Sequence, residues 1–363
     1  MTAPLGRLLT IILGTIVPLF FTTWPCQAQN ARSVSAASYV KRGVEWYAKG
    51  ELDRAMADYN IALTFDPNSA AAYLNRGLTQ QAKGDLAGAL ADFDRAIAIQ
   101  PRSAEAYYNR GLANYAKRDL NAATADYSKA IEIKPRWVAA YINRATAFLV
   151  RGQLDAALND YNRAIALNPC QAEAYSGRAL LRHGTGDSLG ALADVNRAIK
   201  LEPTFAQAYV VRGDIKFAQK DVAGAMADFN TSIAMQPQLA EAYQRRGLAH
   251  QAREDWQAAL LDYDRAILLN ARYSDAYHNR GTLRFARGRF EEAIADFSKA
   301  IEIEPSLGLA YLNRGIVRWV RSQRIEAERD FDQCLKLNPD LKSLLEQRLR
   351  ELNTPEERHE KGK

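Results

Sequence analysis

The side chains best suited to metal binding or nucleophilic catalysis are sparse in this chain of 363 residues, which has four His and three Cys. The histidines share no H-E-x-x-H spacing, and none stands beside a pair of cysteines that could complete a zinc site. We expect His183 and His278 on helix faces, in ordinary solvated or partly packed positions. The sequence therefore predicts no metal site.

Other catalytic patterns are also missing. The run Gly184 to Gly190 is rich in glycine, but it follows a helical segment, whereas a phosphate-binding loop follows a strand. Asp and Glu are numerous, yet they recur at a fixed spacing and form no unique pair suited to acid–base catalysis. The run Gly186 to Gly190 matches the letters of the G-x-S-x-G nucleophile motif, but it follows a helical segment at the turn of a repeat, whereas that motif joins a strand to a helix. We expect no catalytic residue, no cofactor and no enzymatic activity.

Composition excludes several further classes. A hydrophobic content of 48% excludes a largely disordered chain, and three Cys are too few for a disulfide scaffold. The 48 basic and 42 acidic residues give a net charge of +6, which is mild for this length. Basic residues do recur along predicted helices, but acidic residues are interspersed, so we expect a solvated outer face and no nucleic-acid partner. These basic residues are Arg95, Lys129, Arg163, Arg197, Arg265 and Lys299.

The first residues resemble an export signal. Arg7 precedes an apolar run from Leu8 to Phe21, and small residues follow as far as Ala28. This pattern predicts a signal peptide over residues 1–28, cut after Ala28, and an exported protein of the periplasm. The apolar run is shorter than the ~20 residues of a membrane span, so an uncleaved anchor is the alternative and the mature chain should have no transmembrane span.

A 34-residue period governs the rest of the chain. Each unit has Arg three residues and Asp nineteen residues after its Tyr, and Pro follows after twenty-eight in eight of nine units. Such a fixed period is the signature of a repeat protein. Nine units span residues 36–341, with their tyrosines at Tyr39, Tyr73, Tyr107, Tyr141, Tyr175, Tyr209, Tyr243, Tyr277 and Tyr311.

Each unit has the pattern of two helices joined by a turn. In the third, Ala104 to Lys117 has no helix breaker, Arg118-Asp119 marks a turn, and Asn121 to Ile133 has apolar residues at helical spacing. Pro ends the second helix. Gly at the turn of five units supplies the positive φ that a tight connection needs. We predict an all-α chain of αα-hairpins without strands, in which distant Cys170 and Cys334 are unpaired structural residues.

The units resemble the tetratricopeptide repeat (TPR). The resemblance rests on Tyr107-Tyr108-Asn109-Arg110-Gly111, Ala123, Asp126-Tyr127, Ala130-Ile131 and Pro135, repeated nine times. It implies a right-handed superhelix of nine units. A leucine stripe over residues 342–353 predicts a capping helix, and 354–363 a disordered tail. Repeat five departs from the pattern with Gly177, Ala179, Ser188 and Val195.

The recurring Arg differs from the family, which often has Leu at this position. Arg on the first helix and Asp on the second predict a bidentate, partly buried ion pair. This pair would join the two helices of a unit or link neighbouring units. A surface that recognises charges is the alternative.

The resemblance also indicates where a partner would bind. In several TPR proteins, Asn two residues after this Tyr lines a concave groove and pairs with the main chain of a peptide. Here those residues are Asn75, Asn109, Asn143, Asn279 and Asn313, and nearby aromatic residues are Tyr108, Tyr115, Phe217, Phe285 and Trp319. The alternatives are that Asn only spaces the helix and that the aromatic residues belong to the core between repeats.

The Asn series is interrupted at Gly177, Val211 and Arg245, so one interrupted site and two shorter sites both remain open. The family clamps a C-terminal carboxylate with Lys and Asn on this face, and the corresponding positions here have apolar or small residues instead. We predict a non-enzymatic scaffold or assembly factor that binds proteins or extended peptides in the cell envelope. The alternative is an accessory subunit that binds a polymer or glycan in envelope biogenesis. The oligomeric state stays open.

Overall fold

The computed structural model describes residues 27–353, with side chains from Ala36 to Leu352. Residues 1–26 of the predicted signal peptide and the predicted tail lie outside this range. The helices are α1 (Gln27–Ala48), α2 (Leu52–Phe65), α3 (Ala70–Ala82), α4 (Leu86–Ile99), α5 (Ala104–Ala116), α6 (Leu120–Ile133), α7 (Val138–Val150), α8 (Leu154–Leu167), α9 (Ala172–Gly184), α10 (Ser188–Leu201), α11 (Ala206–Ala218), α12 (Val222–Met235), α13 (Ala240–Ala252), α14 (Trp256–Leu269), α15 (Ser274–Ala286), α16 (Phe290–Ile303), α17 (Gly308–Val320), α18 (Arg324–Leu337), the 3₁₀ turn η1 (Pro339–Leu341) and α19 (Lys342–Asn353).

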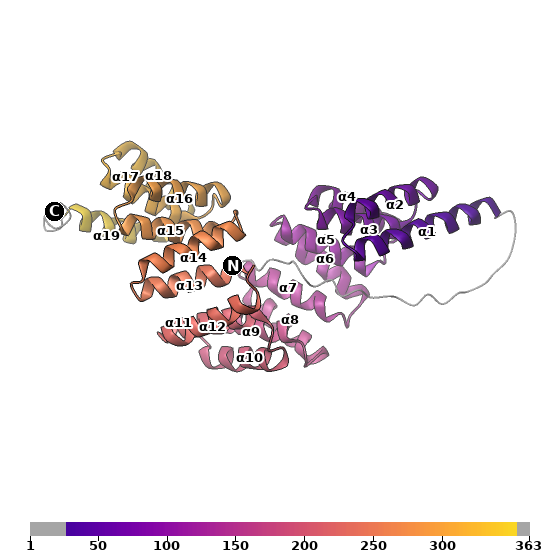
Figure 1. The fold of residues 1–363 in the computed structure, drawn as a ribbon, viewed down its shortest axis with the longest axis horizontal. Helices are drawn as coiled ribbons and strands as arrows, with labels where there is room; N and C mark the ends of the chain where they lie inside the picture. The colour runs from indigo at the N-terminus through magenta and orange to yellow at the C-terminus, as the bar shows by residue number, and fades with distance from the viewer. Residues whose placement is uncertain (1–26, 354–363) are drawn as a thin grey trace. The chain divides into compact units, whose positions relative to one another are not determined.

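The helices pair as αα-hairpins, one for each 34-residue unit (Figure 1). Each odd-numbered helix is the first of its repeat and packs on the even-numbered helix that follows it, from α1 on α2 to α17 on α18. The predicted all-α architecture of nine repeats and a capping helix is confirmed. Between residues 27 and 353, no helix is long and apolar enough to cross a membrane.

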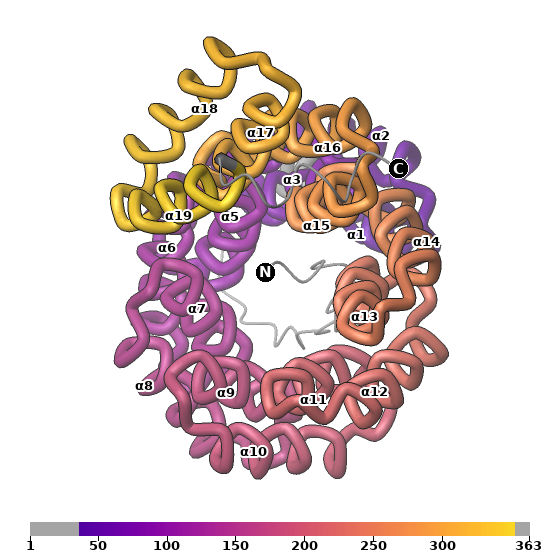
Figure 2. Tube along the Cα trace, turned by 90° about the vertical axis from the view of Figure 1, so that its left-hand side faces the viewer, coloured from indigo at the N-terminus to yellow at the C-terminus, as the bar shows by residue number. Residues whose placement is uncertain are grey.

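The chain divides into two compact units after Leu201. Unit 1 holds repeats one to five, and unit 2 holds repeats six to nine with the cap. Within each unit a second helix also packs on the first helix of the next repeat, as α4 does on α5 and α12 on α13. The first helices form one layer and the second helices another, and in Figure 2 the first helices lie on the inner side of each unit's curve. We call the surface of this layer the first-helix face.

Turn chemistry sets the hairpins. Five turns contain Gly at a φ of 73–88°, as predicted, but Arg118, Lys220, Glu254 and Ser322 adopt a φ of 60–66° at the equivalent place in the other four repeats. A non-glycine residue rarely adopts this conformation. An Asp directly after this residue often caps the second helix; Asp119 Oδ1, for example, accepts the Ala122 N–H at 3.0 Å.

Close packing of the two helices depends on a small residue four positions after the Tyr. A methyl group at Gly77 would lie 2.7 Å from Phe93 Cε1, and one at Gly111 would lie 2.7 Å from Tyr127 Cε1. Repeat five has Ala179 at this position, and there the ring is replaced by the smaller Val195, which is fully buried. The two departures of repeat five therefore compensate one another.

Repeat four solves the same problem differently. It has Ala145 at the small position and keeps the ring of Tyr161, both fully buried. A methyl group at Gly177, on the next first helix, would lie 2.5 Å from Tyr161 Cε1. Gly177 interrupts the Asn series because the Tyr161 ring leaves no room for a Cβ atom there.

The last hairpin is covered by α19. Leu345 is buried in a cluster with Leu312, Ile316 and Phe331, and other leucines of the predicted stripe pack around it. Cys334 is buried in the same cluster, whereas Cys170 is exposed in the turn before α9. Both are free thiols. The prediction of a structural role is thus wrong for Cys170, because its side chain is exposed in a turn and belongs to none of the described hydrophobic clusters.

Candidate partner-binding surface

In each of the nine repeats, one Arg–Asp pair joins the two helices. In repeat four, Arg144 donates from Nε to Asp160 Oδ2 at 2.7 Å and from Nη2 to Asp160 Oδ1 at 2.8 Å. The nine Asp residues are only 2–5% exposed. The predicted bidentate, partly buried pair is confirmed in every repeat, at Arg42–Asp58, Arg76–Asp92, Arg110–Asp126, Arg144–Asp160, Arg178–Asp194, Arg212–Asp228, Arg246–Asp262, Arg280–Asp296 and Arg314–Asp330.

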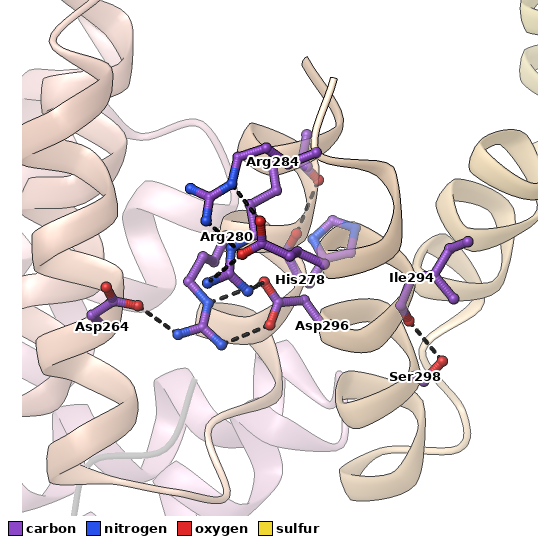
Figure 3. A network of polar contacts seen from close by, with 10 residues as sticks. Asp264, His278, Arg280, Arg284, Ile294, Asp296 and Ser298 are labelled. Carbon is purple, nitrogen blue, oxygen red and sulfur yellow. Dashed lines mark hydrogen bonds and ion pairs between the residues drawn. The ribbon is translucent and has the colours of Figure 1, made fainter. Parts of the chain in front are cut away.

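The same guanidinium also links neighbouring repeats. Nη1 of Arg144 donates to Ser128 Oγ on the preceding second helix at 3.0 Å, and Nη1 of Arg280 donates to Asp264 Oδ1 at 2.5 Å. Figure 3 shows Arg280 between Asp264 and Asp296. The two alternatives left open by the sequence, joining helices within a unit and linking units, are combined in one side chain.

Several of these Asp residues bind a second partner that sequence reasoning missed. This partner is the basic side chain seven residues after the Tyr of its repeat. In repeat eight it is Arg284, whose Nη1 donates to Asp296 Oδ2 at 2.7 Å (Figure 3). Arg182, Lys216 and Arg318 make the same contact in their own repeats. Hydrogen bonding to Asp194 raises the pKa of Arg178. The charges of the nine Arg–Asp pairs are thus neutralised within the fold. This favours a structural role for the pairs over a surface that recognises charges.

The predicted Asn residues all lie half-buried on first helices. The side-chain amides of Asn75 and Asn109 donate to carbonyl oxygens of their own helices, those of Ala71 and Glu105, both at 2.8 Å. These contacts fit the alternative in which Asn stabilises its own helix. Each uses the amide nitrogen.

Two other Asn residues link adjacent first helices. Asn143 Nδ2 donates to the Tyr108 hydroxyl at 2.7 Å, and Asn313 Nδ2 lies 2.9 Å from His278 Nε2. Asn279 is adjacent to His278, whose pKa burial lowers. The structure thus brings Asn143 together with predicted Tyr108, across neighbouring repeats.

The predicted aromatic residues belong to hydrophobic clusters between helices. Tyr108 stacks near Trp137, with ring centroids 4.5 Å apart, and burial raises its pKa to about 12. Trp319 lies between the Phe331 ring and the Arg324 guanidinium, which is 3.5 Å from its ring centroid. Tyr115, Phe217 and Phe285 are likewise half-buried against cluster residues. This matches the alternative in which they form core between repeats.

A polar cluster that does not repeat lies on the first-helix face of unit 2. Asp214 on α11 forms an ion pair with Arg245 on α13, with Oδ2 and Nε 3.2 Å apart. One turn earlier on α13, Glu241 is only 7% exposed and accepts from Gln207 Nε2 of α11 at 2.8 Å. Sequence reasoning missed this cluster, because Asp214 and Glu241 come from different repeats and come near one another only when the helices stack.

The cluster contains strongly perturbed acids. Burial, only partly offset by Arg245, raises the pKa of Asp214 to about 7. Tyr273, which precedes α15, donates from its hydroxyl to Gln244 Oε1 at 3.4 Å. Burial and the charge of Glu241 raise the pKa of Tyr273. The sequence did give a signal: Asp214 occupies a position that is Leu in four repeats, Leu78, Leu112, Leu180 and Leu248.

Within the described ranges, no three His, Cys, Asp or Glu residues are arranged to hold a metal ion. A layer of helix faces with buried, internally paired charges is the arrangement of a repeat scaffold.

Comparisons with known proteins agree with this class. Family profiles described as tetratricopeptide repeat match residues 246–324, 104–136 and 184–240, and one described as TPR repeat matches 43–84, 81–118 and 147–186. The chain belongs to the tetratricopeptide repeat proteins, a family of protein-binding scaffolds. The comparison with curated proteins finds no match.

Solved structures share the fold at low identity. A tetratricopeptide repeat protein from Parabacteroides merdae is 22% identical, with a TM-score of 0.59 over 65% of this chain and 93% of the other. The Cut9–Hcn1 hetero-tetramer gives 15% identity and a TM-score of 0.58 over 80% of this chain and 59% of that one. PilF of Pseudomonas aeruginosa is 17% identical, with a TM-score of 0.50 over 59% of this chain and 97% of PilF. These likenesses establish the fold.

Proposed function

We propose that this protein is an exported scaffold that holds extended peptide segments of other proteins against its first-helix face in the cell envelope. The observation that carries the proposal is the row Asn75, Asn109 and Asn143 on three successive first helices of unit 1, all half-buried. An Asn side chain offers both a donor and an acceptor, so it can pair with a peptide group whatever the peptide sequence. The Arg–Asp pairs support the proposal because they fix the spacing of the helices that present the row.

The test is a cross-linked pull-down from the native envelope fraction with the mature chain. Wild type is compared with Asn75→Ala/Asn109→Ala/Asn143→Ala, and a matched control carries Arg95→Ala/Lys129→Ala/Arg163→Ala on the second helices. We expect partners to be lost only in the Asn variant, at equal thermal stability. Partners retained by the Asn variant and lost by the control would move binding to the other layer.

The same experiment separates the polymer-binding alternative. Because Tyr115, Phe217 and Trp319 pack in clusters, their substitution by Leu keeps an apolar side chain in each cluster and removes the ring on which a glycan would stack. Loss of binding in these variants, with the Asn variant unaffected, would favour a polymer or glycan.

Export is tested at the N-terminus. Residues 1–28 have the charge and apolar pattern of a cleaved signal, so we expect the protein of the envelope fraction to begin at Gln29. N-terminal sequencing of the native protein measures this directly. A retained N-terminus in the membrane pellet would indicate an anchor.

A further inference from the structure

The contact between α11 and α13 buries a polar cluster beside its apolar packing, whereas the contact between α15 and α17 joins apolar packing to the Asn313–His278 contact. Around α17, Leu312 and Ile316 pack with Phe285 of the preceding first helix. At α11 the equivalent of Ile316 is Asp214, with a side chain only 14% exposed. Burying charge between two helices is costly unless every charge is paired. A polar contact at this place therefore needs a balance of charges.

Ionised Asp214 would place more negative than positive charge at this contact. Glu241 and Arg245 lie one turn apart on α13, at the spacing of a favourable helical pair. Ionised Asp214 adds a second carboxylate to one guanidinium, and Asp275 in the first turn of α15 adds a third nearby. The packed form thus holds one buried cation against an excess of anions.

The geometry of the ion pair does not offset this excess. Arg245 Nε is buried and makes no hydrogen bond, although Asp214 Oδ2 is only 3.2 Å away. Burial lowers the pKa of Arg245, but the charges of Asp214, Glu241, Tyr273 and Asp275 raise it above its usual value. Arg245 therefore stays charged, and Asp214 is the group at this contact that gains or loses a proton near neutral pH.

We propose that the α11–α13 contact is a proton-sensitive joint, which tightens when Asp214 carries a proton and loosens when Asp214 is ionised. Ionised Asp214 gains hydration when the helices separate, whereas protonated Asp214 does not. Separation would change the spacing of the first-helix face at repeats six and seven. The proposal goes beyond the proposed function, because it concerns the joint whether or not a peptide binds.

The sign follows from proton binding. In the open form the Asp214 carboxyl has an ordinary pKa of about 3.9, and in the packed form its pKa is about 7. The packed form therefore holds the proton that the open form releases between these values. Stability of the joint should fall as the pH rises from about 4 to about 7 and level off above that.

Hydrogen exchange measured by mass spectrometry on the mature chain tests the joint. Protection of α11 and α13, relative to α5 and α7 of the same sample, is compared near pH 5 and near pH 8. We expect at least about a tenfold loss of relative protection at the higher pH in wild type, since one pKa unit corresponds to a factor of ten. Asp214→Asn, which mimics the protonated form, should remove this loss.

Two further variants keep the result decisive. Asp332→Asn, an exposed acid of α18 in the same unit, should behave as wild type. Asp214→Leu places the side chain of four other repeats at this position and should also be insensitive to pH. His250 of α13 lies against Asp255, which precedes α14, and Asp262 of α14. These residues and Tyr273, Asp275 and His278, which flank α13, are retained in every variant.

Two outcomes would overturn the proposal. One is a wild-type joint whose relative protection is the same at both pH values. The other is an equal loss in Asp214→Asn, which would assign the effect to the retained groups. Neither outcome bears on peptide binding, so the proposed function would stand or fall separately.

Discussion

At Arg144 a guanidinium occupies the position where the repeat family often has Leu, and three of its nitrogens donate to Asp160 and Ser128. The charge is partly buried because the side chain must reach both helices of its own repeat and the preceding one. Replacing one partner alone would leave the other charged, desolvated and without its bond. This makes each pair more sensitive to single substitutions than an apolar contact of similar size.

We expect Asp160→Ala to destabilise its region by about 3–5 kcal/mol, the usual effect of removing one partner of a buried ion pair. Urea denaturation followed by circular dichroism measures the change. Arg144→Leu/Asp160→Ala, which removes both charges, should recover most of it. A single variant that unfolds like wild type would show that the pair contributes little.

The glycine that faces each aromatic ring gives a second prediction. Gly77→Ala places a methyl group 2.7 Å from Phe93 Cε1, so we expect a loss of about 1–3 kcal/mol from overpacking. Gly77→Ala/Phe93→Val copies the Ala179–Val195 pair of repeat five and should be the more stable of the two variants. Denaturation midpoints of both proteins would decide, and equal midpoints would contradict the compensation.

At the scale of the hairpin, composition and turn chemistry act together. The 34-residue spacing predicted two helices in every repeat, and the positive φ at the turn was predictable wherever Gly stands. Arg118 and Lys220 adopt the same conformation without Gly because the connection between the two helices has the same length in those repeats. Helix pairing was therefore readable from the sequence, whereas the backbone strain at four turns was not.

Lys220→Gly should stabilise unit 2 by about 1 kcal/mol, since the φ of Lys220 is 66° and Gly adopts that region without a Cβ clash. Thermal unfolding would show a higher midpoint. The reverse change Gly84→Lys in unit 1 should lower it. An unchanged midpoint in both would mean that these turns carry no strain.

At the scale of the molecule, stability in a repeat array is a sum over neighbouring contacts. Both the fold and the Arg–Asp pairs followed from residues that recur with the period. The Asp214–Arg245–Glu241 cluster did not, because its members stand at three different positions of their repeats and meet only through stacking. Predicted Asn and aromatic residues were placed on the correct helices, but their hydrogen bonds and packing depend on neighbouring repeats.

Deleting residues 342–353 should uncover Leu312, Ile316 and Phe331, which α19 covers. We expect exchange protection to fall mainly in α17 and α18, with α5 to α8 unchanged, because each repeat is stabilised by its neighbours. Hydrogen exchange by mass spectrometry resolves the two regions. A uniform loss along the chain would indicate long-range cooperativity instead.

The Tyr161 ring has a consequence for how such an array can evolve. Because that ring lies where a Cβ atom of residue 177 would be, repeat four is compatible only with a following repeat that has glycine at this position of its first helix. Duplicating repeat four next to itself would bring Asn143 against Tyr161. Repeats four and five are thus a matched pair, and exchanging either one singly should bring a side chain against the Tyr161 ring or leave its space unfilled.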